Sequence, residues 1–273
     1  MRFAGKTAVV TGSGRAGGLG EAIVRRLSAE GATVVVSDIG ASQDAATPDA
    51  MIGSSADMQA IVGSLIAGGS AFPCDVRDPV QVRALAAHAV AAHGSLDIWV
   101  NNAGIGYIMK PLLDVSPDDW RAVIDVNLSG AFYGLQAAAE VMITQGRGGR
   151  IVNIASQAAK SGFPHAQAYT ASKHGLVGLV RSAATELGDH GITVNNVCPN
   201  HVTTGLGAWQ NAHFAALQGV SVDEYLIRMA ARIPMGRPGL PGDTAAAVAF
   251  LCSDDATYIT GESMNVSGGE EPH

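Results

Sequence analysis

The chain has 273 residues, of which 47% are hydrophobic and 15% charged, and 34 residues are glycine. This composition is typical of a compact α/β protein and excludes a disordered or fibrous chain. With 17 basic against 24 acidic residues the net charge is −7, and no cluster of lysine and arginine could neutralise a phosphate backbone, so we expect no nucleic-acid partner.

The N-terminus runs directly into a strand-like segment, and no apolar stretch is long enough to span a bilayer. We therefore expect a soluble cytoplasmic protein without a membrane partner. Its three cysteines, Cys74, Cys198 and Cys252, are odd in number and widely spaced. This favours buried free thiols over a disulfide framework or a cysteine metal site.

Short β-branched runs alternate with longer helical patterns, which indicates βαβ units and a parallel sheet. Most runs are apolar throughout, as strands covered by helices on both faces must be. The predicted strands are Thr7–Thr11, Thr33–Asp38, Ala71–Cys74, Ile98–Asn101, Ile151–Ala155, Thr193–Val197 and Met264–Val266. The predicted helices are Gly20–Glu30, Pro79–His93, Pro117–Gln145, Ala168–Leu187 and Asp243–Leu251.

The pattern between these elements suggests how the chain is organised. Ser116 and Asp119 are predicted to cap the start of the third helix reciprocally. No composition break or long linker divides the chain, so we expect one domain over residues 1–273. Two stretches look irregular, Gly40–Ser55 and Asn200–Ser221, and the second is predicted to form a lid over a substrate.

The first predicted strand leads into a glycine-rich loop, Gly12–Gly20, and then directly into a helix. Glycine lets the backbone approach a ligand closely, and a helix N-terminus offers free N–H donors, so the loop predicts a pyrophosphate site. A plain glycine turn is the alternative. Asp38 ends the second strand, where a dinucleotide-binding protein places the carboxylate that binds the adenosine ribose. It would repel a 2′-phosphate and so favours NAD over NADP, although Arg15 could neutralise such a phosphate.

Tyr169 and Lys173 are one turn apart in a predicted helix, so their side chains share one face. Hydride transfer at a carbon bearing oxygen needs a group that moves one proton to or from that oxygen. A tyrosine phenol titrates near ~10, and a neighbouring ammonium lowers its pKa by favouring the phenolate. The pair therefore predicts an acid/base, Tyr169, tuned by Lys173.

Several pieces of the sequence, taken in order, resemble the short-chain dehydrogenase/reductase family over nearly the whole chain. They are Thr11-Gly12 with Gly18-Leu19-Gly20, Cys74-Asp75-Val76, Asn101-Asn102-Ala103-Gly104, Asn127, Ser156, Tyr169 with Lys173, Pro199 with Val202 and Thr204, and Tyr258-Ile259-Thr260-Gly261. The resemblance implies a single doubly wound parallel sheet of about seven strands, the Rossmann fold. It also implies an NAD-dependent alcohol dehydrogenase or ketoreductase acting on CH–OH groups.

The resemblance assigns a role to each matching residue. In the catalytic set, Asn127 steadies a proton-relaying water, Ser156 binds the substrate oxygen, and Lys173 also holds the nicotinamide ribose beside Tyr169. The implied cofactor-binding residues are Gly12, Arg15, Gly18, Leu19, Gly20, Asp38, Ile39, Asp75, Val76, Asn102, Ala103, Gly104, Tyr169, Lys173, Pro199, Val202 and Thr204.

Taken singly, these residues also have ordinary structural explanations. Asn127 could be a mid-helix residue bonded to backbone, Ser156 a loop residue, and Asp75 a helix cap. Tyr169 could be a core aromatic with Lys173 as its solvated neighbour. Their joint occurrence in the family's order favours the catalytic interpretation.

Two features depart from the family pattern. The loop is longer than usual between Gly12 and Gly18, which leaves open which amides meet the pyrophosphate. We favour Gly18-Leu19-Gly20, because the helical pattern follows it directly. The family's Pro-Gly after the sixth strand is Pro199-Asn200 here, and asparagine tolerates left-handed backbone, which would also let its side chain reach the substrate.

The expected substrate pocket is polar. It offers Gln157, His165, Asn200, His201 and Trp209, along with Lys160, Gln210 and His213. Such a set suits a hydroxylated, polyol- or sugar-like, or anionic small molecule, although exposed loops are polar anyway. The histidine spacing matches no metal site, and we expect no metal.

Two other functions remain open on the sequence alone. The chain could be a catalytically silent NAD(H)-binding sensor or scaffold, since a fold does not fix a function. An epimerase or dehydratase is disfavoured, because no sizeable substrate domain follows the last strand. The resemblance also implies a homo-oligomer, a tetramer or dimer joined through the two longest helices. Gly175, Gly178 and Ala183 would allow that close approach, or close packing within one monomer.

Overall fold

The structure is a computed structural model that describes residues 1–41 and 51–271. These residues form a seven-stranded sheet in the order β3-β2-β1-β4-β5-β6-β7, with every neighbouring pair parallel. The strands are β1 Thr7–Thr11, β2 Thr33–Asp38, β3 Gly69–Pro73, β4 Ile98–Asn101, β5 Gly149–Ile154, β6 Ile192–Pro199 and β7 Ser263–Val266. The chain winds outward from β1 in both directions, which confirms the predicted doubly wound parallel sheet.

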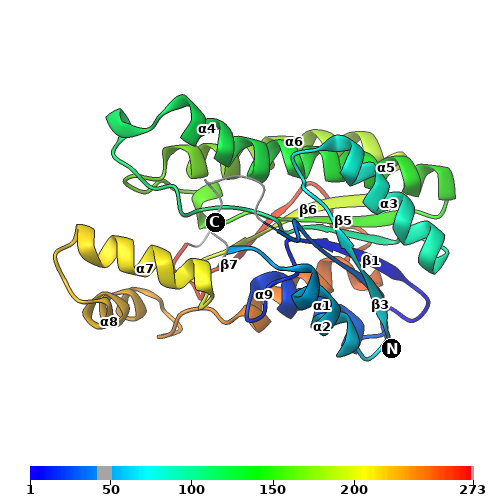
Figure 1. Cartoon of the computed structure of the whole chain (residues 1–273), viewed down its shortest axis with the longest axis horizontal. Coiled ribbons are helices and arrows are strands. Elements are labelled where there is room, and N and C mark those ends of the chain that lie inside the picture. Colours follow the sequence, from blue (N-terminus) through cyan, green and yellow to red (C-terminus); the bar gives the residue numbers. More distant parts are fainter. Residues whose placement is uncertain (42–50, 272–273) are drawn as a thin grey trace.

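Helices cover both faces of the sheet (Figure 1). One layer contains α1 Leu19–Ala29, α2 Ser55–Gly63 and α9 Pro241–Leu251, and the other contains α3 Pro79–His93, α5 Gly130–Gln145 and α6 Gln167–Leu187. Each layer has its own apolar cluster against the sheet: Val34 belongs to the first and Val35 to the second. Since successive strand residues point to opposite faces, this is why the strand runs are apolar throughout.

The predicted helix over Pro117–Gln145 is present but changes its hydrogen bonding in the middle. It consists of α4 Pro117–Ile124, a π-helical segment Asp125–Ser129, and α5. The predicted cap is confirmed, because Asp119 N–H donates to Ser116 Oγ at 3.1 Å and Ser116 N–H donates to an Asp119 carboxylate oxygen at 3.0 Å. Apolar periodicity predicts that a helix is present but not whether its N–H groups bond to the fourth or the fifth carbonyl back along the chain, so it cannot show a π segment.

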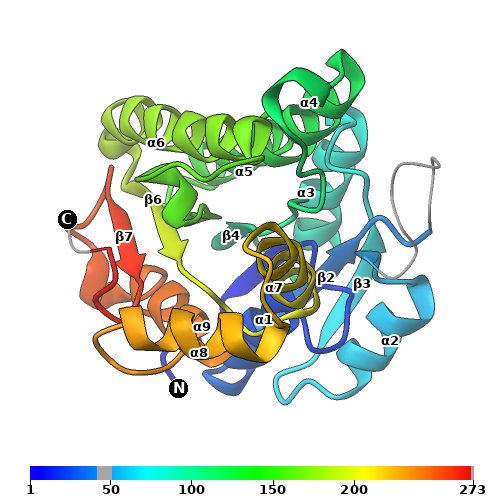
Figure 2. The same ribbon diagram turned by 90° about the vertical axis from the view of Figure 1, so that its left-hand side faces the viewer.

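The prediction that Asn200–Ser221 is irregular is wrong. The segment contains α7 Gly205–Leu217, and α8 Val222–Arg232 follows it. Thr204 caps α7 by accepting a hydrogen bond from Gly207 N–H at 3.2 Å. The sequence did not predict this helix because glycines, which have low helix propensity, stand near the start of α7. In Figure 2, α7 stands in front of the carboxyl ends of the strands.

Two smaller predictions also need correction. Part of the stretch Gly40–Ser55 lies outside the described residues, and α2 begins at its last residue. The third strand begins earlier than predicted, because Gly69 is already paired with Val34 of β2. The three cysteines are buried free thiols, as predicted.

A row of buried asparagines crosses the second half of the sheet. Asn101 of β4, Asn153 of β5 and Asn196 of β6 lie opposite one another in register. Asn101 Nδ2 donates to Asn153 Oδ1 at 2.8 Å, and Asn153 Nδ2 donates to Asn196 Oδ1 at 3.2 Å. Asn196 Nδ2 in turn reaches Ser263 Oγ of β7 at 2.9 Å. This asparagine ladder joins four strands through side chains as well as backbone.

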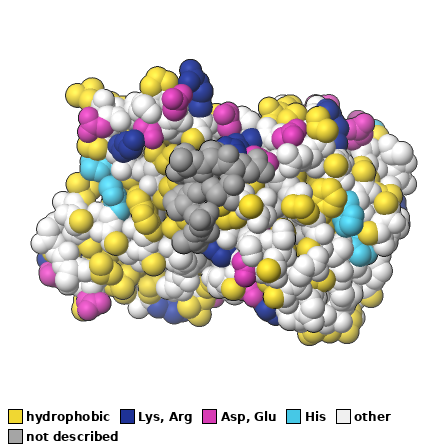
Figure 3. Space-filling view, viewed as in Figure 1, with side chains coloured by type: hydrophobic (Ala, Val, Ile, Leu, Met, Phe, Trp, Pro, Cys, Tyr) yellow, Lys and Arg dark blue, Asp and Glu magenta, His cyan; other side chains and the backbone are white. Residues whose placement is uncertain are grey.

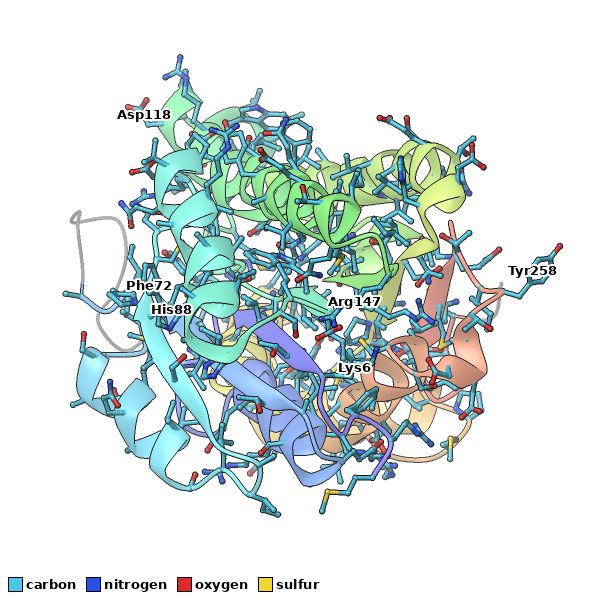
Figure 4. All side chains as sticks on the ribbon, turned by 90° about the vertical axis from the view of Figure 1, so that its right-hand side faces the viewer. Lys6, Phe72, His88, Asp118, Arg147 and Tyr258 are labelled. Carbon is cyan, nitrogen blue, oxygen red and sulfur yellow. The ribbon has the colours of Figure 1, made fainter. Side chains whose placement is uncertain are left out.

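The opposite edge of the sheet, where the strands begin, is held by a charged cluster. Asp97, which precedes β4, accepts hydrogen bonds from Thr7 N–H at 2.9 Å and Ser95 Oγ at 2.7 Å. Arg147 lies 3.0 Å and Lys6 3.8 Å from the same carboxylate, and both are labelled in Figure 4. A buried carboxylate with this many partners fixes the amino edge of the sheet.

The surface shows how the charges are distributed. On the face in Figure 3, acidic and basic side chains are scattered among apolar and uncharged ones, and outside the grey atoms no continuous basic area is visible there. Of the helices within the described ranges, none combines the length and apolar composition that crossing a membrane requires.

Candidate active site

A cleft of about 560 Å³ lies at the carboxyl ends of the strands, and α7 forms one of its walls. In a doubly wound sheet this edge, where the strand order reverses beside β1, is where ligands bind. All residues predicted to bind the cofactor, from Gly12 in the loop to Thr204 after β6, line this cleft. Of the predicted catalytic set, Ser156, Tyr169 and Lys173 line it too, whereas Asn127 is buried behind it.

The glycine loop presents bare backbone to the cleft. A Cβ atom on Gly20 would lie 2.5 Å from the Gly12 carbonyl oxygen, and one on Gly12 would lie 2.6 Å from the Ala103 Cα. Helix α1 begins at Leu19 with Gly18 at the N-cap and without a side-chain cap. The helix thus starts within Gly18-Leu19-Gly20, the segment for which we predicted contact with the pyrophosphate. An uncapped N-terminus among close-packed glycines fits the pyrophosphate of a dinucleotide.

Asp38 lies beside this loop at the end of β2. Its carboxylate accepts hydrogen bonds from Gly14 N–H at 3.0 Å and from Ile39 N–H at 2.9 Å. Burial raises the pKa of Asp38, and these backbone donors and the Arg15 charge act in the opposite direction. The Arg15 guanidinium contacts Met51, whose sulfur lies 3.1 Å from Nη1.

The end of β4 is tied to the start of the glycine loop. Asn102 Nδ2 donates to the carbonyl oxygens of Thr11 and Gly12 at 2.9 and 2.8 Å. Thr11 Oγ1 accepts from the backbone N–H groups of Asn102 and Ala103, both at 3.1 Å. These contacts keep the two central strand ends together beneath the cofactor region.

Asp75 does not cap a helix. The N-cap of α3 is Asp78, whose side chain accepts from Val80 N–H at 2.8 Å. The Asp75 carboxylate instead pairs with Arg77, at 2.7 Å to Nη2. Asp75 lines the cleft, and the capping alternative is wrong; its place beside the adenine stays a prediction.

The catalytic side chains converge from β5 and α6. Tyr169 is within hydrogen-bonding range of Ser156, which follows β5. Lys173 donates from Nζ to the Ile154 carbonyl oxygen at 2.8 Å, and Nζ lies 5.6 Å from the centre of the Tyr169 ring. The end of β5 and the first turns of α6 thus place a hydroxyl, a phenol and an ammonium in one corner of the cleft.

Burial governs the protonation of this corner. Burial raises the pKa of Tyr169, and the hydrogen bond with Ser156 opposes that rise only in part. Burial also lowers the pKa of Lys173 to about 8. Desolvation, which disfavours the charged forms of both groups, is thus the largest influence on both pKa values. The lowering of the phenol pKa by Lys173 stays a prediction.

Asn127 lies in the π-helical segment, and its side chain is occupied by the backbone of Ile105. Oδ1 accepts from Ile105 N–H at 2.8 Å, and Nδ2 donates to the Ile105 carbonyl oxygen at 2.9 Å. Nδ2 also lies 3.2 Å from Ser172 Oγ on α6. Asn127 therefore pins the loop after β4 against the helix that carries Tyr169 and Lys173.

The predicted substrate residues fall into two groups. Gln157, Asn200 and His201 line the cleft, whereas His165 and Trp209 do not. The latter pair meets at His213 of α7: His165 Nδ1 lies 3.3 Å from His213 Nε2, and the His213 and Trp209 rings stack at 5.6 Å. They join α7 to the segment before α6. The described residues contain no group of three or more side chains suited to hold a metal ion.

Asn200 does not adopt the expected left-handed backbone. Among the described residues that are not glycine, only His165 has a positive φ, of 66°. Asn200 is buried, and Oδ1 accepts from His201 N–H at 2.9 Å while Nδ2 donates to the Glu270 carboxylate. The side chain closes the turn through hydrogen bonds and so removes the need for left-handed backbone.

Sequence reasoning missed the contribution of α8 and the C-terminal segment to the cleft. Tyr225, Arg232 and Glu270 all line it. Glu270 accepts from Arg232 Nε at 3.2 Å and lies 3.5 Å from His201 Nε2. Burial lowers the pKa of His201, although Glu270 acts in the other direction. No spacing rule links residues so far apart in sequence, so only the tertiary structure reveals this cluster.

The fold and this cleft define a dinucleotide-binding oxidoreductase, and comparisons with known proteins agree. The family model described as enoyl-(acyl carrier protein) reductase matches residues 12–271. The L-2,3-butanediol dehydrogenase of Corynebacterium glutamicum is 36% identical and covers 97% of this chain and 98% of its own length. The galactitol 2-dehydrogenase of Agrobacterium fabrum is also 36% identical, over 98% of both chains.

Solved structures agree as well. Levodione reductase superposes with a TM-score of 0.86 at 31% identity over 98% of each chain. A variant of actinorhodin polyketide ketoreductase, solved with NADPH, gives 0.86 at 33% identity over 100% of this chain and 99% of its own. The chain belongs to the short-chain dehydrogenase/reductase family, whose members use a nicotinamide cofactor, and is an oxidoreductase acting on CH–OH groups. All four of these relatives are named as enzymes, which gives no support to a silent sensor or scaffold.

Proposed function

We propose that the protein interconverts a secondary alcohol and a ketone with Tyr169 as the acid/base. The observation that carries this assignment is that Ser156 and Tyr169 lie within hydrogen-bonding range of each other in the same cleft as the glycine loop. When bound, the nicotinamide accepts a hydride from the carbinol carbon or returns one to the ketone carbon.

The chain's own residues move the proton. In oxidation, Tyr169 takes the hydroxyl proton as the carbon–hydrogen electron pair leaves as hydride, and in reduction it returns the proton. Ser156 holds the reacting oxygen. Lys173, whose Nζ donates to the Ile154 carbonyl oxygen, offers positive charge beside the phenolate and would hold the nicotinamide ribose. Asn127 keeps the loop after β4 in place, and through its backbone it can steady a water that passes protons to solvent.

Replacement of Tyr169 tests this assignment. Tyr169→Phe should lower kcat by about 10²–10⁴-fold, with the dissociation constant of NADH unchanged, whereas Tyr258→Phe at a fully exposed site (Figure 4) should change neither. Because burial raises the phenol pKa, oxidation, which needs phenolate, should accelerate as pH rises from 6 to 9. Near-normal turnover in Tyr169→Phe would overturn the proposal.

We propose NAD rather than NADP as the physiological cofactor. The support is Asp38, a carboxylate at the end of β2 that would repel a 2′-phosphate, while the Arg15 guanidinium contacts the Met51 sulfur. A relative solved with NADPH shows that the family does not fix this choice. Cofactor preference must therefore come from the chain's own residues.

We propose a neutral polyol- or sugar-like substrate. The support is the polar lining formed by Gln157, Asn200, His201 and Gln210, together with relatives named for butanediol and galactitol. The Glu270 carboxylate in the same lining disfavours an anionic substrate, because Arg232 is already paired with it.

We propose further that residues 1–273 act as one domain in which residues 200–221 form a lid built on α7. Two contacts support a closed position: Gln210 Nε2 donates to the Gly106 carbonyl oxygen at 3.2 Å, and His213 meets His165. Gly106 in turn lies against the Tyr169 ring. The lid is thus fastened directly beside the catalytic residue.

A homo-oligomer, tetramer or dimer, in the cytoplasm completes the proposal. Phe132 and Ile143 of α5 stay 42% and 40% exposed, and Gly178 of α6 has open space around it, which leaves room for a partner helix. A Cβ atom on Gly175 would instead lie 2.7 Å from the Leu128 side chain of the same chain, so Gly175 allows close packing within the monomer. Light scattering should give a multiple of 27.8 kDa; a monomer mass would overturn the assembly.

A further inference from the structure

The segment that leads into α2 touches the glycine loop through backbone alone. A Cβ atom on Gly53 would lie 2.3 Å from the Gly14 carbonyl carbon and 2.5 Å from the Gly14 Cα. Side chains do not approach backbone this closely, so position 53 accepts only glycine unless the segment shifts. Gly14 lies between Gly12 and Gly18, where the loop is longer than the family pattern. Gly53 therefore packs against the part of the loop in which this chain departs from its family.

Gly14 is enclosed on its other sides as well. A Cβ atom on Gly14 would lie 2.6 Å from Met58 Cγ of α2 and 2.7 Å from Asp38 Cβ. The residue after Gly53 is fixed in turn, because Ser54 pairs with Gly40 in a parallel bridge and its side chain caps α2. The loop, the end of β2 and the start of α2 thus form one close-packed unit around Asp38.

Backbone donors from this unit hold the Asp38 carboxylate. Gly14 N–H donates to Oδ2 at 3.0 Å and Ile39 N–H to Oδ1 at 2.9 Å. Gly53 N–H also lies within hydrogen-bonding range of the carboxylate. A carboxylate has about four acceptor positions, so these donors leave about one of them for the cofactor. A ribose hydroxyl can donate to that position, whereas a dianionic 2′-phosphate has no proton to offer.

We infer that Gly53 is a specificity-determining residue for the cofactor: docked on Gly14, it keeps the Asp38 carboxylate from turning aside and so selects NADH over NADPH. This inference rests on the proposed preference for NAD. To admit a 2′-phosphate the carboxylate would have to rotate away from its donors. Gly14 and Gly53 are both buried, so their N–H groups would then be left without partners. Gly53 acts through Asp38 and is a positioning residue.

The dissociation constants of NADH and NADPH, measured by the fluorescence of the reduced nicotinamide, test this inference without turnover. Gly53→Ala should push the segment off Gly14 and release the carboxylate. NADH should then bind about tenfold more weakly, while the Kd of NADPH should stay within about twofold of the wild-type value. Loss of packing alone would weaken both cofactors equally. Gly63→Ala, at the end of α2 where the added atom meets open space, is the matched control and should change neither.

Two further variants separate the action on Asp38 from packing. In an Asp38→Asn background, Gly53→Ala should leave the ratio of the two dissociation constants unchanged, because the carboxylate through which it acts is gone. Ser54→Ala removes the cap of α2 but adds no atom against the loop. It should lower the discrimination against NADPH in the same direction by about two- to threefold.

Three results would overturn the inference and leave the preference for NAD standing. They are equal weakening of both cofactors in Gly53→Ala, wild-type discrimination in that variant, and the same loss of discrimination in the Asp38→Asn background. If Gly53→Ala does not fold, Ser54→Ala decides, and an unchanged ratio there overturns the inference. A wild type that binds NADPH as tightly as NADH would refute the proposed preference for NAD, and the inference with it.

Discussion

The two ends of the cleft are built from different kinds of structure. The end at β1 and β2 is backbone: close-packed glycines, an uncapped helix and the tie between Asn102 and Thr11. The end at α7, α8 and the C-terminal segment is side chain: amides, histidines, an arginine and carboxylates held by long-range hydrogen bonds.

The difference reflects what each end has to recognise. A cofactor of constant shape is best bound by rigid main chain, where a Cβ atom added to a glycine would collide with neighbouring backbone. A substrate that differs between relatives is met by side chains that can be exchanged without moving a strand. Substitutions should therefore affect cofactor binding at one end and substrate KM at the other, and the following predictions test that division.

Gly20→Ala should have the largest effect. A Cβ atom there would lie 2.5 Å from the Gly12 oxygen, so the loop must shift, at about 1–3 kcal/mol in the free energy of unfolding and about 100-fold in the dissociation constant of NADH. Calorimetric titration measures the latter. Gly63→Ala at the end of α2, where the added atom meets open space, is the matched control and should be neutral. Unchanged NADH affinity in Gly20→Ala would contradict a backbone-built site.

Asp38→Asn should change cofactor preference without disturbing substrate binding. Removing the charge should lower the ratio of kcat/KM for NAD⁺ over NADP⁺ by about tenfold or more. Asp254→Asn, an exposed carboxylate paired with Arg150, controls for net charge. Wild-type preference for NADP⁺ would refute the assignment.

The same variant makes a pH prediction for stability. Burial raises the pKa of Asp38 in the folded state, so as pH rises the carboxyl ionises in the unfolded chain first. The free energy of unfolding therefore falls as pH rises from 3.8 through the folded-state pKa. Asp38→Asn should therefore be more stable than wild type at pH 7 and lose that advantage near pH 4. Chemical denaturation at both pH values measures the difference.

Gln210→Ala should have a moderate effect confined to the substrate end. Loss of the hydrogen bond to Gly106 loosens α7 beside Tyr169 and should raise the substrate KM by about three- to tenfold, with NADH affinity unchanged. Gln59→Ala, at an exposed position on α2, is the control. Weaker NADH binding in Gln210→Ala would show that the two ends are coupled.

Ser116→Ala should have the smallest effect, because α4's cap belongs to neither end. It should cost about 1 kcal/mol, or about 2–4 °C in Tm, with kinetics unchanged. The bond from Lys110 and the cap hold the pKa of Asp119 at about 2. The stability that ionised Asp119 contributes is therefore present above pH 3.8 and lost as the pH falls toward 2, so the stabilities of the variant and the wild type should converge in acid.

Ser221→Ala removes the equivalent cap of α8 and should also raise the substrate KM. Kinetics identical to those of the wild type would weaken the proposed role of α8.

The sequence predicted the cofactor end well, because its signals are local: a strand, glycines, a helix start and an acidic residue at a strand end. Tyr169 and Lys173 were equally readable, since helical spacing determines their shared face. Periodicity could not reveal the π segment at Asn127. The cluster around Glu270 was missed because it joins α8, the turn after β6 and the chain's last residues, which only tertiary packing brings together. The rise in the Tyr169 pKa was missed because burial depends on the whole surroundings.

The asparagine ladder has a consequence for how the enzyme can fail. Side chains on one face of a strand repeat every second residue, so β5 cannot slip slightly: moving by one residue would point Asn153 to the other helix layer and break both of its amide bonds. Ser156 follows the same strand and would move with it. Damage to the ladder should therefore divide a preparation into fully competent and inert molecules. An active-site titration would then show fewer working sites, each with an unaltered KM.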